Sequence, residues 1–173
     1  MKGTMWRRNW MALPILSLLA TQARSIAQTR EGNRVGPKNA VDFKNPAALS
    51  KPNGYSHIVE ISGGRTVYIA GQVALDKEGQ LAGKDDFAAQ VRQVFANLNE
   101  AVVSAGGSFK DVVKLNSFCV DRVDRSQVPV VRETRDRYVN TKTPPVSTFV
   151  FVHDLVRPEW LIEIEAVAVI PAA

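Results

Sequence analysis

Two glutamates near the C-terminus, Glu163 and Glu165, have a spacing that is compatible with acid–base chemistry. They lie two residues apart in an apolar stretch over residues 160–170, and alternate residues of a strand face the same side of a sheet. Two carboxylates in one cleft suit the transfer of protons to and from a substrate. The spacing is equally compatible with carboxylates that face solvent or pair with a basic residue across the sheet.

Arginines form a second group of candidate residues. Arg132, Arg135 and Arg137 lie in the stretch 127–138, which is expected to be a helix. A guanidinium on this helix can bind an acidic ligand, because its planar fork pairs with a carboxylate through two hydrogen bonds. The alternative is a solvated helix face on which these arginines pair with the acidic residues between them.

Other chemistries find no support in the sequence. The two histidines, His57 and His153, lie apart from any cluster with the spacing of metal ligands, so no metal is predicted. The sequence contains no glycine-rich phosphate loop, no Gly-x-Ser-x-Gly motif and no Cys-x-x-Cys pair, and no cofactor is indicated. The single cysteine, Cys119, lies in an apolar strand pattern and is predicted to be a packed small hydrophobic residue rather than a nucleophile.

The N-terminus accounts for most of the net charge of +5. Residues 1–27 hold four of the 22 basic residues and no acidic one; the remaining 18 basic and 17 acidic residues give a net +1. Such a balance does not predict nucleic-acid binding. The basic start, the ten-residue apolar run 11–20 and the small residues before position 28 predict a signal peptide over 1–27. The mature protein is then periplasmic or secreted, without membrane contact after removal of the signal; the alternative is an uncleaved membrane anchor.

The remaining chain reads as a flexible N-terminal arm over 28–52, which holds five Gly or Pro residues, and one domain over 53–173. The expected elements are strands 55–61 and 66–70 joined as a hairpin, a helix from Phe87, a strand 111–120, a helix 127–138, and strands 147–152 and 160–170. This order predicts an α/β (α+β) fold with two helices on one face of a mixed sheet. The other face is left to pack against neighbouring subunits.

Four short stretches give the chain a family resemblance. They are Gly54-Tyr55, Ala70-Gly71-Gln72, the stretch 105–114 with its Ala-Gly-Gly and Asp-Val-Val-Lys segments, and Ile-Glu-Ile-Glu-Ala from residue 162. In this order they resemble the RidA (YjgF-type reactive-intermediate deaminase) family over residues 53–170. The resemblance implies a chorismate-mutase-like fold and a homotrimer with small-molecule clefts between its subunits.

Deaminases of that family hydrolyse enamines and imines to a 2-keto acid and ammonia. By resemblance, Glu163 is the catalytic residue that positions or activates water, and Tyr55 lines the cleft. The same resemblance implies that the backbone around Ala70, Gly71 and Gln72 binds the substrate.

The family's substrate-binding arginine is absent, because Ser147 stands at its position. A serine brings no charge, so a contact worth roughly 1.5–3 kcal/mol is lost. The chain is identified as a member of an Arg-less branch, in which Arg132 is the first candidate for a substitute cation and Ser147, Thr148 and Phe149 are further ligand contacts. Two hypotheses follow: a hydrolase similar to 2-iminobutanoate/2-iminopropanoate deaminases, or a non-catalytic ligand-binding or protective periplasmic protein on the same trimeric scaffold.

Overall fold

The computed structural model describes residues 40–172. The signal peptide expected over 1–27 and the first part of the expected arm lie outside the described residues. Within residues 40–172, no helix combines the length and the apolar character needed to cross a bilayer.

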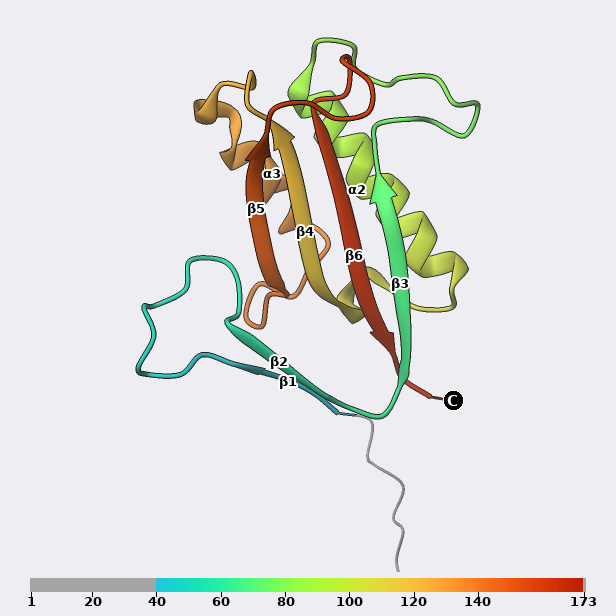
Figure 1. Cartoon of the computed structure of the whole chain (residues 1–173). Helices are drawn as coiled ribbons and strands as arrows, with labels where there is room; N and C mark the ends of the chain where they lie inside the picture. The colour runs from blue at the N-terminus through green and yellow to red at the C-terminus, as the bar shows by residue number, and fades with distance from the viewer. Residues whose placement is uncertain (1–39, 173) are drawn as a thin grey trace, which may run out of the picture. The chain divides into compact units, whose positions relative to one another are not determined.

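The centre of the structure is a four-stranded sheet (Figure 1). Its strands run in the order β3 (Arg65–Gln72), β6 (Ile162–Ile170), β4 (Val112–Val120) and β5 (Val146–Val152). The pairs β3–β6 and β4–β6 are antiparallel, whereas β4 and β5 are parallel. The mixed sheet predicted from the sequence is therefore confirmed.

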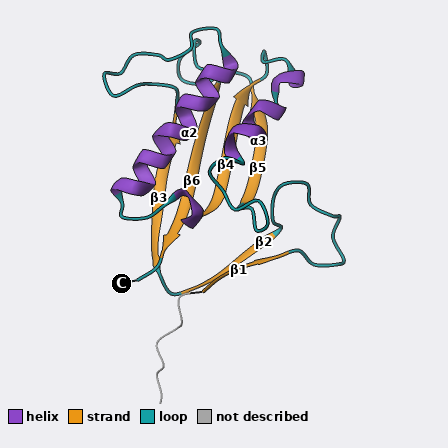
Figure 2. Ribbon diagram, turned by 180° about the vertical axis from the view of Figure 1, so that it is seen from behind, coloured by secondary structure: helices purple, strands orange, loops and turns teal. Residues whose placement is uncertain are grey.

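Two helices, α2 (Phe87–Ser104) and α3 (Pro129–Arg135), cover one face of this sheet (Figure 2). Helix α2 begins where the sequence predicts, because the Asp86 carboxylate accepts a hydrogen bond from the Ala89 N–H at 2.9 Å. The side chains that α2 buries are Phe87, Gln90, Val91, Val94, Phe95, Leu98 and Val102. They form the predicted apolar stripe and pack on the sheet to make the core.

The strand register decides which side chains lie under the helices. On β6, Ile162, Ile164 and Ala166 are buried, and the glutamates between them face the opposite side. Cross-strand partners share a face, so the pairs Ser117–Ile164 and Ser117–Phe149 place Phe149 on the helix-covered face. The face without helices is called the open face below.

The predicted hairpin between residues 55–61 and 66–70 is wrong. Strand β2 (Ile58–Ser62) pairs instead with β1 (Ala40–Lys44), from Ala40↔Ser62 to Lys44↔Ile58, and these two strands form a separate two-stranded sheet. Lys44 forms an ion pair with Glu60 across this sheet. The hairpin prediction missed the competing partner, because residues 40–44 lie inside the segment 28–52 that was read as a flexible arm. The pair β1–β2 is called the ribbon below.

Candidate functional site

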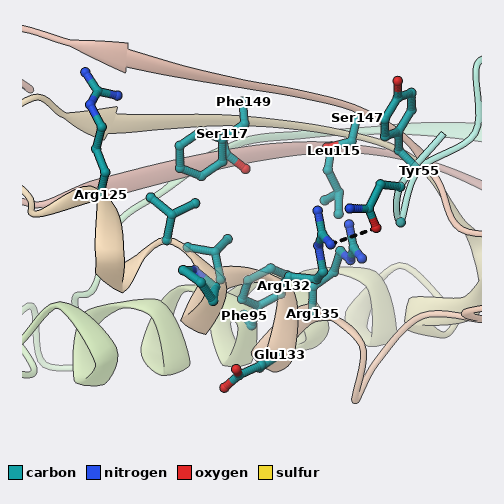
Figure 3. Close-up of a pocket in the computed structure, with 15 residues that line it drawn as sticks. Tyr55, Phe95, Leu115, Ser117, Arg125, Arg132, Glu133, Arg135, Ser147 and Phe149 are labelled. Atoms are coloured by element: carbon teal, nitrogen blue, oxygen red, sulfur yellow. Dashed lines mark hydrogen bonds between the residues drawn. The ribbon is translucent and has the colours of Figure 1, made fainter. Parts of the chain in front are cut away.

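A cavity of about 610 Å³ lies between α3 and strands β4 and β5 (Figure 3). Its lining combines guanidinium, hydroxyl and apolar side chains, among them Tyr55, Phe95, Leu115, Ser117, Arg125, Arg132, Arg135, Ser147 and Phe149. The structure thus brings together five of the residues singled out from the sequence: Tyr55, Arg132, Arg135, Ser147 and Phe149.

One wall of the cavity comes from the loop that connects β1 to β2. Ser56, which is buried, fixes this loop against the start of β5: its N–H donates to the Pro145 carbonyl at 3.3 Å and its hydroxyl donates to the Pro144 carbonyl at 2.7 Å. These bonds place Asn53, Gly54 and Tyr55 at the cavity end that holds Ser147.

Two guanidiniums meet at Gly54. A Cβ on this residue would lie 3.1 Å from Arg135 Nη2 and 3.3 Å from Arg132 Nε, and its φ of +79° also favours glycine. Arg132 Nη1 donates to Asn53 Oδ1 at 2.9 Å, whereas Arg135 pairs with Asp136 at 2.6 Å. Pairing with an acidic neighbour therefore holds for Arg135, and no carboxylate among residues 40–172 forms an ion pair with Arg132. Among the described residues, the Arg132 guanidinium at this end of the cavity therefore has a neutral partner, the Asn53 side chain.

A third guanidinium lies at the other end of the cavity. Arg125 places its Cζ 3.9 Å from the centre of the Phe151 ring, a cation–π contact. The sequence analysis missed Arg125 and Asn53, because neither stands in a motif or a periodic pattern. Their only sequence signals are that Asn53 precedes Gly54 and that Arg125 follows a turn-forming aspartate.

Glu163 lies on the open face, beside Gly71. A Cβ built on Gly71 would come within 1.8 Å of Glu163 Oε1, so only glycine leaves room for the carboxylate in this position. The ladder between β3 and β6 is irregular between Ile69 and Gln72, and this irregularity contains Ala70 and Gly71. The Gln72 side chain folds back and donates to the Ala70 carbonyl at 3.1 Å.

Glu165 has a different environment on the same face. Its Oε1 accepts a hydrogen bond from Asn116 Nδ2 at 2.7 Å, so the cross-sheet partner is an amide rather than the basic residue considered as an alternative. Together with Tyr68, Ala70 and Lys114 it lines a second hollow of about 420 Å³. Asn116 pairs in register with both Glu165 and Thr148, so Thr148 is exposed on the open face as well.

The predicted site residues therefore divide between the two faces of the sheet. Ser147 and Phe149 lie on the helix-covered face with Arg132, whereas Glu163, Ala70, Gly71 and Thr148 lie on the open face. The helix-covered side of one chain can bind an anion, and its open side presents a carboxylate next to backbone groups. One chain alone does not bring these two functions together.

The structure bears on two further chemistries, metal binding and thiol reactivity. Among residues 40–172 no group of three or more His, Cys, Asp or Glu side chains is placed to hold a metal ion. Cys119 is fully buried, and burial raises the pKa of its thiol to about 11. The thiol therefore stays protonated near neutral pH, which agrees with its predicted role as a packed core residue.

The sequence of this chain is similar to those of known proteins. A family profile described as Endoribonuclease L-PSP matches residues 45–170. The 3-aminoacrylate deaminase RutC of Acinetobacter baylyi is 32% identical over 102 residues, which cover 59% of this chain and 77% of RutC. Protein DfrA of Myxococcus xanthus is 32% identical over 115 residues, which cover 66% of this chain and 84% of DfrA.

Solved structures agree with the sequence comparison. YyfB from Yersinia pestis, described as a protein of unknown function of the conserved Rid protein family, is 36% identical, with a TM-score of 0.69 over 75% of this chain and 98% of YyfB. RidA from the Antarctic bacterium Psychrobacter sp. is 32% identical, with a TM-score of 0.54 over 74% of this chain and 98% of RidA. The predicted RidA-like fold is confirmed. The chain belongs to the Endoribonuclease L-PSP family, the family of the RidA and YjgF proteins that its sequence resembles.

Proposed function

We propose that this protein binds small carboxylate-bearing 2-imino or 2-keto acids in the cavity beside α3, and hydrolyses the imines or enamines to a 2-keto acid and ammonia. The observation that carries the proposal is the meeting of the Arg132 and Arg135 guanidiniums at Gly54, in the cavity that Ser147 leaves open. Two cations at this point compensate for the arginine that the strand lacks, so the Arg-less branch keeps a carboxylate site by moving its cation from β5 to α3.

Arg132 is the better placed of the two arginines to hold a carboxylate. Its partner within the described residues is the neutral side-chain oxygen of Asn53, so its charge is not neutralised there. The Asn53 contact fixes the guanidinium plane and leaves other N–H groups for a ligand. Arg135 already donates two hydrogen bonds to Asp136, so it contributes positive potential to the site rather than a second pair of N–H groups for the ligand.

Catalysis in this proposal needs a neighbouring copy of the chain. Glu163 lies on the open face, and this face exposes apolar surface that requires a cover, including Tyr68, which is 82% exposed. In a homotrimer the open face of one subunit packs beside the cavity of the next, which brings Glu163 to the bound imine. The name of RutC, a 3-aminoacrylate deaminase, supports this reaction class.

Glu163 carries out the proton transfers of the proposed reaction. Glu163 takes a proton from water as the oxygen attacks the imine carbon, the C=N electron pair moves to the nitrogen, and Glu163 returns the proton to that nitrogen. Glu163 then transfers the hydroxyl proton of the carbinolamine to the amine, which leaves as ammonia and gives the 2-keto acid. Arg132 holds the carboxylate throughout, beside the positive charge of Arg135, and so positions the carbon for attack.

The reaction is proposed to take place outside the cytoplasm. The basic and apolar pattern of residues 1–27 supports removal of a signal peptide on export to the periplasm or the medium. The N-terminal sequence of the protein isolated from its own cells tests this: a start near residue 28 supports export, and a start at Met1 contradicts it.

A second candidate function is binding without turnover. The specific observation that favours it is the serine at position 147, which removes the family's charged contact from the strand. In that case the cavity binds and protects an acid that leaves unchanged.

The test combines binding and turnover on the purified protein. Calorimetric titration with 2-oxobutanoate is expected to show that Arg132→Ala weakens binding roughly 10- to 150-fold, the value of a lost charged contact. The control is Arg137→Ala, an exposed arginine just after α3 that does not line the cavity. Release of ammonia from 2-iminopropanoate that is lost in Glu163→Gln supports the hydrolase. Tight binding without ammonia release supports the second candidate, and equal binding by wild type and Arg132→Ala removes the carboxylate site.

A further inference from the structure

The cavity is large for a short imino acid. Its volume of about 610 Å³ falls in the middle of the range of roughly 300–1,000 Å³ that holds drug-sized ligands. A ligand with the carbon skeleton of pyruvate occupies only a small part of this space. The shape and chemistry of the remaining space therefore carry information about the ligand.

The cavity is elongated along β5. Ser147, Phe149 and Phe151 follow each other on the helix-covered face, and alternate residues of a strand advance by about 7 Å. Arg132 and Arg135 lie at the Ser147 end, and Arg125 lies over Phe151 at the other end. Figure 3 shows Arg125 at one end and Arg132 and Arg135 at the other, with the Phe149 and Phe95 rings between them.

Apolar side chains make up most of the middle of the cavity, and the Ser117 hydroxyl, opposite Phe149 in register, is a polar group there. Phe149 comes from β5, Leu115 from β4, Phe95 from α2, and Val128 and Val131 from the α3 segment. The phenyl ring of Phe149 is held edge-on against Phe151, with ring centres 5.5 Å apart. Apolar walls favour ligand groups that leave water at little cost and disfavour polar groups that find no partner there.

We propose that the acid bound here carries a bulky apolar side chain, aromatic or branched aliphatic. Its carboxylate is bound by Arg132, and its side chain extends along Phe149 toward Val128. Ser147 determines this specificity, because a longer side chain at its position projects from the same strand face into the space that the ligand side chain fills. The inference rests on the carboxylate site of the proposed function and adds the class of side chain.

A dicarboxylate fits the same cavity less well. Its second carboxylate has to pass the largely apolar middle to reach Arg125, whose guanidinium already lies on the Phe151 ring.

The experiment is a calorimetric titration of the purified protein with four 2-keto acids: pyruvate, 2-oxoglutarate, 4-methyl-2-oxopentanoate and phenylpyruvate. We expect the last two to bind at least tenfold more tightly than pyruvate. Phe149→Ala and the milder Phe149→Leu are expected to reduce this preference. Phe149→Leu replaces Phe149→Ala in the test if the alanine variant does not fold. The control is Val150→Ala, one residue along β5 on the open face. Ser147→Arg is expected to abolish the preference for the two larger acids while the protein still binds pyruvate.

The outcomes separate the two proposals. If pyruvate binds as tightly as phenylpyruvate, the proposal of an apolar ligand side chain is overturned, whereas the proposed carboxylate site is retained. Preference for 2-oxoglutarate that disappears in Arg125→Ala overturns it in favour of a dicarboxylate. Absence of binding by all four acids removes the carboxylate site itself and the inference with it.

Discussion

The Glu163 carboxylate occupies the space directly over Gly71: a methyl group at residue 71 would stand 1.8 Å from Glu163 Oε1 and 2.7 Å from Glu163 Cδ. The two residues come from paired strands, β3 and β6, and meet where their ladder is irregular. Glycine is therefore the residue type that permits the observed carboxylate position, and the pair can be tested without touching Glu163 itself.

Gly71→Ala is expected to displace the Glu163 carboxylate and to lower the turnover of 2-iminopropanoate at least tenfold, while binding of 2-oxobutanoate is retained. The carboxylate is the flexible end of a side chain, so the fold accommodates the methyl group. Steady-state ammonia release measures the effect. In the double variant Gly71→Ala/Glu163→Gln, turnover should equal that of Glu163→Gln alone. Full activity in Gly71→Ala would show that the carboxylate position is unimportant.

Gly54→Ala is expected to weaken 2-oxobutanoate binding, because the new Cβ lies 3.1–3.3 Å from both guanidiniums. Its positive φ also predicts a loss of about 1–2 kcal/mol in the free energy of unfolding. Gly79→Ala is a matched control: it has nearly the same φ, +78°, and nothing within 4 Å of its Cβ. Urea denaturation should show similar losses for the two variants, whereas calorimetry should show weaker binding in Gly54→Ala alone. Equal binding by both variants contradicts the guanidinium site.

Subunits with complementary defects are expected to restore each other. Glu163→Gln and Arg132→Ala should each be inactive, because each removes one half of the proposed site. In trimers refolded from a mixture of the two, some interfaces combine a native Glu163 with a native Arg132 and should release ammonia. If the mixture remains as inactive as the separate variants, the carboxylate and the guanidinium do not act across an interface.

Burial of Cys119 predicts a pH dependence of stability. The folded protein holds the thiol protonated to a pKa of about 11, compared with an ordinary value of 9.0. Between these values the unfolded chain has lost the proton and the folded chain has kept it, so the free energy of unfolding falls as pH rises from 9 towards 11. Urea midpoints at pH 8 and pH 10 measure this loss, and Cys119→Ala should show a smaller one. A thiol reagent at pH 8 should modify the wild type only after unfolding.

Gln90 is expected to be the costliest polar side chain to remove. It is fully buried, donates to the carbonyls of Gly83 and Glu159 at 3.2 and 2.9 Å, and accepts from the Leu161 N–H at 2.9 Å. Gln90→Leu leaves these backbone groups without their partner, and the free energy of unfolding should fall by about 3 kcal/mol. Gln93→Ala, on the same helix with a single bond to Asn97, should cost about 1 kcal/mol. Equal costs for the two variants would contradict this role.

The sequence was sufficient for α2 and for the order of the helices and strands that follow β1. The apolar spacing from Phe87 and the Asp86 cap are local features, and the structure follows them. Strand β1 was missed because Ala40–Lys44 is short and lies among Gly and Pro residues, so its identity depends on a partner, β2, that is distant in sequence.

The site was harder to predict than the fold. Alternation along one strand shows that Glu163 and Glu165 share a face of the sheet. It does not show which residues of the neighbouring strands lie on that same face. That relation is set by the register of β4 against β5 and β6, which separates Ser147 from Glu163. Arg132 could be proposed from its residue type, whereas Arg125 lies on a 3-10 helix, Arg125–Gln127, and reaches the cavity through its own contact with the Phe151 ring.

The ribbon couples ligand binding to the position of the loop between β1 and β2. Strands β1 and β2 pair with each other and not with the four-stranded sheet, yet the loop between them supplies Asn53, Gly54 and Tyr55 to the cavity. A ligand that contacts this loop holds the ribbon's connecting segment against β5. By thermodynamic reciprocity, any event that pulls the loop away from β5 must also lower the affinity for the ligand. Amide hydrogen exchange in residues 40–62 should then slow when the cavity is filled, and the ribbon becomes a reporter of occupancy.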